Sequence, residues 1–134
     1  MVEFAIALPV IVFTIFGTID MGTLMWAQFS LQHSVEMAAR CATISTNNPQ
    51  ATQCTTTSNP SATTSVQYFA ANQYWGPGPA PTYTVSLASA GNTCGKNGNT
   101  GNQVSGTYIS SLLGSALPGA KVTITAQSCY PSPT

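Results

Sequence analysis

The first 44 residues have the pattern of one long helix. From Val2 to Ile44 the only helix breakers are Pro9, Gly17 and Gly22. The stretch Phe4–Ile19 holds 16 residues without a charge, which cover about 24 Å as a helix. A bilayer's hydrocarbon core is about 30 Å thick. The apolar stretch is therefore slightly short of a membrane span by itself.

Extension of the apolar stretch through Trp26 makes it long enough to span a bilayer, provided that Asp20 lies near an interface or is paired. Trp26 and Phe29 are then expected to be interfacial anchors or packing residues. A secretory signal peptide also begins with an apolar run. Here no basic region precedes the run, Glu3 stands at its start, and no small-residue cleavage site follows it. These features favour a membrane span.

The second half of the predicted helix is amphipathic. One stripe stays mostly apolar at alternating spacings of four and three residues: Leu24, Gln28, Leu31, Val35, Ala38 and Ala42. Elsewhere on the helix, Glu36 and Arg40 form an i, i+4 pair of opposite charge. This half is predicted to cover a small globular head with its apolar face.

A polar segment follows the helix. Residues 42–66 are rich in Ser and Thr and contain two prolines, so they are predicted to form a loop. O-glycosylation of residues 43–66 and a plain solvated loop are both open. Ser65–Trp75 then resembles a short helix that ends at the Gly76–Pro79 run.

The remaining chain predicts a small antiparallel sheet. Thr82–Ala88, Val104–Ile109 and Lys121–Gln127 are enriched in β-branched residues and partly alternate. Gly91–Gly106, rich in Gly and Asn, is predicted to be a surface loop. The expected fold class is α+β: a long N-terminal helix that carries a small, disulfide-stapled antiparallel β head. Residues 1–44 form the helix and residues 45–134 the head.

Charge is scarce, with three acidic and three basic residues in 134. Nucleic acid is excluded as a partner, because phosphate binding needs clustered Lys and Arg. His33 is the single histidine, so neither a His metal cluster nor an ordinary triad is expected. Glu3 and Asp20 would lie about 25 Å apart on a straight helix, too far for paired-carboxylate chemistry. We therefore expect no enzyme, cofactor or metal, and an uncharged polar surface suited to packing beside copies of itself outside the cell.

The cysteines are even in number and widely spaced: Cys41, Cys54, Cys94 and Cys129. No C-x-x-C pair points to zinc or redox chemistry. Disulfides in an oxidising compartment fit best, and four buried free thiols are the alternative. Of the three possible pairings, Cys41–Cys54 with Cys94–Cys129 is favoured because each bond closes a local loop.

The N-terminal motifs resemble a known family. Residues 2–10 (VEFAIALPV), 16–22 (FGTIDMG), 26–28 (WAQ) and 35–40 (VEMAAR) are similar to the TadE-like pilin and pseudopilin family of tight-adherence (Tad) systems. The resemblance covers about the first 42 residues. It implies a precursor cleaved by a prepilin peptidase, an inner-membrane stage, and export by an assembly machinery into an extracellular pilus on the cell surface.

Glu3 departs from this family's usual pattern. Pilin-like proteins usually carry the acidic residue at the fifth mature position, whereas here it is third. The sequence therefore leaves the mature N-terminus undefined.

Five residues are candidates for subunit assembly. Glu3 is expected to pair with a neighbouring subunit's amine and to set the axial register, unless it stays hydrated at the interface. Pro9 lacks an amide hydrogen and would loosen the helix there, or is simply a tolerated transmembrane proline. Gly17 and Gly22 permit close helix approach. Asp20 either pairs with a cation of another subunit or marks the membrane boundary.

Three functions compete. The first is a structural subunit that polymerises with identical copies through its N-terminal helix. The second is a minor tip pilin, adhesin or initiator whose head binds a surface or glycan through Tyr74, Trp75 and Tyr83. The third is a membrane-anchored pilus assembly factor that never enters a filament.

Overall fold

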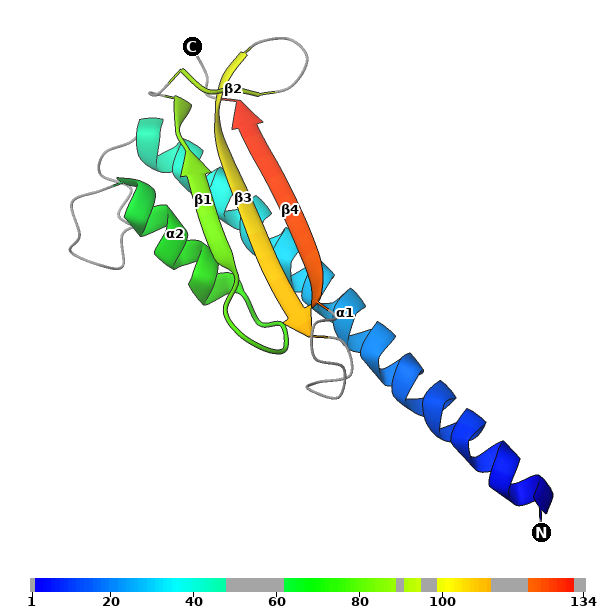
Figure 1. Ribbon diagram of the computed structural model, residues 1–134. Coiled ribbons are helices and arrows are strands. Elements are labelled where there is room, and N and C mark those ends of the chain that lie inside the picture. The colour runs from blue at the N-terminus through cyan, green and yellow to red at the C-terminus, as the bar shows by residue number, and fades with distance from the viewer. Residues whose placement is uncertain (1, 48–61, 89–90, 95–98, 112–120, 132–134) are drawn as a thin grey trace.

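The computed structural model describes residues 2–47, 62–88, 91–94, 99–111 and 121–131. A long helix runs diagonally behind a small sheet and projects from its lower end (Figure 1). The elements are α1 (Val2–Asn47), α2 (Ala62–Gln73), β1 (Thr82–Ser86), β2 (Thr93–Cys94), β3 (Asn99–Ser111) and β4 (Lys121–Pro131). The predicted α+β class, with a long N-terminal helix and an antiparallel head, is confirmed. The division of the chain at residue 44 stays a prediction.

Helix α1 is continuous through Pro9 and ends at Asn47, three residues beyond the predicted end. Helix α2 begins at Ala62. The prediction of loop over residues 42–66 is therefore wrong at both ends, because Ser and Thr in these turns are compatible with helix once tertiary packing holds it. Residues 48–61, on which the glycosylation question mainly falls, lie outside the described part of the chain.

Strand β3 is the centre of the sheet. Strand β4 pairs with it antiparallel from Gly101↔Pro131 to Ser111↔Lys121. Strand β1 pairs with residues 103–107 of β3, and β2 pairs with residues 99–100. The predicted Gly91–Gly106 loop is thus wrong over β2 and the first half of β3. Its Gly and Asn composition is typical of loops, but pairing with β4 supplies the order that local propensity lacks.

The core lies between the sheet and the second half of α1, with α2 beside α1 along the edge strand β1 (Figure 1). Its buried members come from every layer: Ala27, Leu31, Val35, Ala38, Ala39, Ala42, Val66, Ala70, Tyr83, Val104, Tyr108 and Ala126. The predicted apolar stripe of α1 is buried from Leu31 to Ala42. Many of these side chains are alanines, so the layers approach closely.

Gly106 shows how closely they approach. It faces α1 on β3, and a Cβ built there would lie 2.8 Å from Leu31 Cδ1, 3.0 Å from Val35 Cγ2 and 3.1 Å from Tyr83 Cε1. A glycine within a strand often marks such a close approach. A methyl group at this point would require the ends of the Leu31 and Val35 side chains to shift.

Along its middle the sheet face turned away from α1 is polar and uncharged, and at the end of β3 and the start of β4 it carries Ile109 and Lys121. Thr84 and Ser105 hydroxyls are 3.2 Å apart across β1 and β3, and Ser105 and Thr107 stand opposite Gln127 and Thr125 of β4. Hydroxyl and amide groups of this kind hydrogen-bond to water without carrying charge. This face accounts for much of the uncharged surface expected from the composition.

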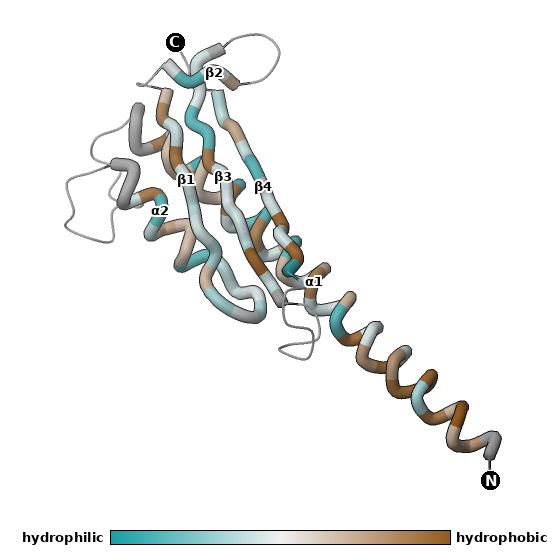
Figure 2. The backbone as a smooth tube through the Cα atoms, in the orientation of Figure 1, coloured by the Kyte–Doolittle hydropathy of each residue, from teal (hydrophilic) through white to brown (hydrophobic). Residues whose placement is uncertain are grey.

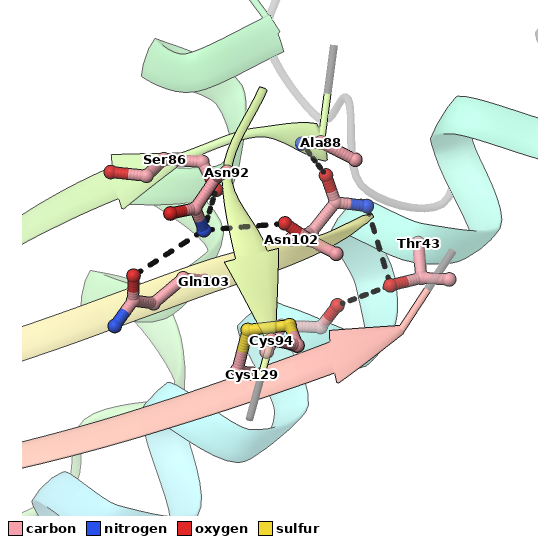
Figure 3. The surroundings of a disulfide bond; sticks show 10 residues. Thr43, Ser86, Ala88, Asn92, Cys94, Asn102, Gln103 and Cys129 are labelled. Carbon is pink, nitrogen blue, oxygen red and sulfur yellow. Dashed lines mark hydrogen bonds between the residues drawn. A yellow bond between two sulfur atoms is a disulfide. The ribbon is translucent and has the colours of Figure 1, made fainter. Parts of the chain in front are cut away.

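A disulfide joins Cys94 of β2 to Cys129 of β4, with the two Cα atoms 5.6 Å apart (Figure 3). The favoured Cys94–Cys129 pairing is confirmed. The bond crosses over Gly101, where an added Cβ would collide with Cys94 Sγ. Cys41 is also disulfide-bonded; Cys54 lies outside the described residues, so the Cys41–Cys54 pairing stays a prediction.

Buried amide groups hold the disulfide end of the head together (Figure 3). Asn102 is fully buried; its Oδ1 accepts the Ala88 amide at 2.8 Å, and its Nδ2 donates to Thr43 Oγ1 at 3.3 Å. Asn92 Nδ2 donates to the carbonyl of Gly101 and to Gln103 Oε1, both at 3.3 Å. Each buried amide is thereby hydrogen-bonded, as stability requires.

Candidate assembly surface

The first half of α1 projects from the head as an apolar rod (Figure 2). Among the described side chains, large hydrophobic groups along this half are exposed on all sides: Phe4, Ile6, Leu8, Val10, Ile11, Val12, Phe13, Ile15, Phe16, Ile19, Met21, Met25, Trp26 and Phe29. Soluble monomers rarely expose apolar patches larger than a few hundred Å². This half of the helix must therefore be covered by lipid or by other protein.

Length and internal hydrogen bonding both suit a membrane. Within the described chain, Phe4–Ile44 is one helix long and apolar enough to cross a bilayer, and its most apolar window is not buried in the head. The hydroxyls of Thr14, Thr18 and Thr23 each donate to the carbonyl three residues earlier, at 2.8 Å. These polar groups are thus satisfied inside the helix, as a hydrocarbon environment demands.

The second half of α1 is fixed to the head at several heights. The Ser30 hydroxyl accepts the Trp75 amide at 3.0 Å. Ser34 donates to the Leu31 carbonyl and lies 2.9 Å from the Tyr83 hydroxyl. Because a serine hydroxyl has one proton, the Tyr83 hydroxyl is the donor to Ser34. Burial raises the pKa of Tyr83, an effect that the hydrogen bond with Ser34 opposes.

Farther along, Arg40 joins the helix to β4. Its Nε donates to the Tyr130 hydroxyl, its guanidinium lies 5.3 Å from the centre of the Tyr130 ring, and it forms the predicted ion pair with Glu36. The hydrogen bond that Arg40 donates to the Tyr130 hydroxyl is the main cause of its raised pKa. The second half of α1 is therefore fixed to the head at several levels, and the projecting half continues the same helix.

The five candidate assembly residues all lie on the projecting half of α1. A Cβ added at Gly17 or Gly22 would meet nothing within 4 Å, so both glycines face open space. Pro9 lies inside the helix. Asp20 is partly covered and its backbone carbonyl accepts the Thr23 hydroxyl. Glu3 is helical, but its side chain lies outside the described part of the structure. One subunit does not gather these residues into a cluster, and their assembly roles stay predictions.

The aromatic side chains considered for a binding head have different environments. Tyr83 is in the core, so its proposed part in surface binding is wrong. Its hydroxyl is hydrogen-bonded to the buried Ser34, 49 residues away in sequence. Tyr74 donates its hydroxyl to the Pro77 carbonyl at 3.1 Å. Burial raises the Tyr74 pKa to about 12, with the nearby Tyr108 hydroxyl adding to the shift. Trp75 alone of the three is largely exposed, at 59%.

Other sites of chemistry do not stand out. An open groove between α1 and β4 is lined mainly by polar groups, among them Gln32, Glu36 and Gln127. His33 is exposed on α1. The described residues contain no group of three or more His, Cys, Asp or Glu placed to hold a metal ion.

The sequence of the rod and its continuation decides the relationship to known proteins. Residues 1–40 match the TadE-like protein family. The resemblance predicted from the N-terminal motifs is thereby confirmed, over the helix and not over the head. The similarity of this helix suggests a pilin-like protein associated with Tad pili. No curated protein and no solved structure is significantly similar to the chain.

Proposed function

We propose that this TadE-like chain is a structural subunit that polymerises with identical copies into an extracellular bacterial pilus. The observation that carries the proposal is the apolar rod, which is exposed on all sides and continues as one helix into a polar head. In a filament, rods pack together in the centre and heads form the surface. Each Å² of apolar surface removed from water contributes about 25 cal/mol as an upper value. Transfer from lipid to a filament contributes less, because the rod is already out of water.

Contacts along the rod would set the geometry of assembly. Gly17 and Gly22 face open space in the subunit and let a neighbouring helix approach closely. Glu3 pairs with a neighbour's amine and fixes the axial register, since an unpaired carboxylate is unfavourable among apolar helices. Pro9 lets the tip bend during packing. Asp20 pairs with a cation of another subunit or lies at the membrane boundary.

Before assembly the rod would be stored in the inner membrane. A prepilin peptidase would process the precursor and an inner-membrane machinery would extract the subunit, as in Tad systems. The finished pilus is on the cell surface, where the Cys94–Cys129 disulfide is stable in an oxidising environment.

The direct test is recovery of the protein from sheared surface filaments, by electron microscopy and mass spectrometry. Abundant recovery supports a main structural subunit. Recovery at trace levels at filament ends would indicate a minor tip subunit. Detection in the inner-membrane fraction alone would sink the polymer proposal and favour an assembly factor.

A matched pair of variants tests the role of close helix packing. Gly17→Leu places a large side chain where the subunit has open space, so the folded head is unchanged while neighbouring rods are forced apart. We expect far fewer filaments from Gly17→Leu and near-normal yield from Gly17→Ala, at equal membrane levels of protein. Equal filament yield from both variants would contradict tight packing at this position.

A second pair tests the register role of Glu3. Glu3→Ala removes the carboxylate and should slow or abolish assembly, whereas Glu3→Asp keeps the charge and should retain part of it. Filament yield by shearing and immunoblotting measures the effect. Normal yield from Glu3→Ala would remove Glu3 from the mechanism.

A further inference from the structure

The end of the head from which α1 projects carries a pair of tryptophans. Trp26 of α1 and Trp75, which follows α2, have ring centres 5.9 Å apart at an angle of 57°. Both rings are about half exposed, at 48% and 59%. The Trp75 backbone amide donates to Ser30 Oγ, one turn of α1 above Trp26. Two segments 49 residues apart in sequence are thus held together at the junction of rod and head.

This junction lies at a defined height along the rod. Twenty-two residues separate Phe4 from Trp26, which corresponds to about 33 Å of helix. A bilayer's hydrocarbon core is about 30 Å thick, with polar headgroup layers outside it. When the apolar rod spans the bilayer, Trp26 therefore falls just outside the hydrocarbon, in the interfacial layer.

Other groups at the same end of the head are those that this layer favours. The loop after α2, the end of β3 and the start of β4 lie at the end from which the rod projects (Figure 1). They present Ile109, which is 51% exposed, and the exposed Lys121. Phe29, one turn above Trp26, is 65% exposed. Tryptophan rings prefer the membrane interface because they combine an apolar body with a polar N–H, and lysine reaches lipid phosphates from such a position.

We infer that the Trp26–Trp75 pair, together with Phe29 on α1 and with Ile109 and Lys121 at the same end of the head, is a lipid-docking surface that seats the head on the phospholipid interface before assembly. The inference rests on the membrane stage of the proposed function. It adds that the head itself, through Trp75, contacts the bilayer. The rod alone would place Trp26 there, whereas Trp75 reaches the same layer only because the head is fixed to α1 as the structure shows.

The chain offers a direct optical test, because Trp26 and Trp75 are its only two tryptophans. Trp26→Phe leaves Trp75 as the sole emitter, and Trp75→Phe leaves Trp26. Each full-length variant is reconstituted into phosphatidylcholine vesicles that contain a nitroxide either near the headgroup or deep in the acyl chain. Intrinsic fluorescence is then measured, with aqueous acrylamide as a third quencher. Circular dichroism and thermal unfolding check that each variant is folded.

Trp75 emission is expected to be quenched strongly by the shallow nitroxide and weakly by the deep one. Acrylamide should quench it less in vesicles than in the denatured protein without detergent. Trp26 should give the same order. If neither nitroxide quenches Trp75 while the lipid nitroxides do quench Trp26, the docking surface is overturned and the membrane stage stands. Failure of both tryptophans to respond would remove the membrane stage as well. Shielding of Trp75 in isolated filaments but not in vesicles would also overturn the inference, by assigning this surface to subunit contacts.

Discussion

Substitution of Gly106 by alanine is the sharpest probe of how the head is attached to the rod. The added Cβ would lie 2.8 Å from Leu31 Cδ1 and 3.0 Å from Val35 Cγ2, two side chains that are fully or almost fully buried. Overpacking of this kind destabilises by about 1–3 kcal/mol. Replacement of glycine by alanine also lowers the conformational entropy of the unfolded chain, which stabilises the folded state by about 0.4–1 kcal/mol. We expect a net loss of about 1 kcal/mol or somewhat more, which lowers Tm by about 4–8 °C per kcal/mol for a head of this size.

The measurement uses the full chain in detergent micelles, followed by near-ultraviolet circular dichroism, because α1 dominates the far-ultraviolet signal. Ser105→Ala is the matched control: it lies on the same strand with its side chain on the opposite, polar face, and should leave Tm almost unchanged. An unchanged or raised Tm for Gly106→Ala would refute the close approach of sheet and helix.

A double-mutant cycle with Leu31 separates steric conflict from a general effect on the strand. Leu31→Ala alone should destabilise by about 2–5 kcal/mol through the cavity that it leaves. In the double variant the new Cβ occupies part of that space. The loss of stability in the double variant should therefore be smaller than the sum of the losses in the two single variants. A coupling of about 1 kcal/mol is expected for residues in contact. Strict additivity would show that Leu31 is not the side chain that Gly106 accommodates.

Three further predictions concern the head. Replacement of Cys94 and Cys129 by serine should cost about 4 kcal/mol by the chain-entropy relation for a 35-residue separation, measured by urea unfolding of the variant and the unchanged chain, both without reductant because Cys41 is disulfide-bonded as well. The Tyr74 pKa is raised from 10.0 to about 12. As the pH rises from about 10 to 12, the unfolded chain therefore loses the Tyr74 proton before the folded chain does, and the free energy of unfolding should fall. Tyr74→Phe should show a shallower fall over the same pH range. Ser34→Ala leaves the buried Tyr83 hydroxyl without its acceptor and should destabilise by about 1–3 kcal/mol, whereas Ser34→Ala combined with Tyr83→Phe should recover part of that loss.

The elements with strong periodicity could be predicted from the sequence. The unbroken apolar and then striped pattern predicted α1, and β-branched alternation located parts of β1, β3 and β4. Strands that form because distant segments of the chain pair with them could not be predicted. The sequence around β2 and in the first half of β3 predicted a loop because it is rich in Gly and Asn. The structure of both segments depends on pairing and on the disulfide to β4.

Long-range contacts explain the misplaced aromatics. Tyr83 is suited to either surface or core, and the buried Ser34 hydroxyl that draws it inward lies on a different element. The contact of Trp26 with Trp75 likewise depends on how α2 packs against α1. Gly106 did carry a signal, since a glycine at an inward position of a β-branched strand indicates a close neighbour.

Because one uninterrupted helix is both the rod and part of the head core, α1 also fixes a rotational phase. Each residue turns the helix by about 100° and advances it by about 1.5 Å. One residue inserted between Gly22 and Met25 would swing the head by about 100° around the rod while barely raising it. Seven inserted residues would nearly restore the direction, to within about 20°, and lift the head by about 10 Å. The number of residues in the projecting part of α1 thus sets the direction in which each head faces around the rod.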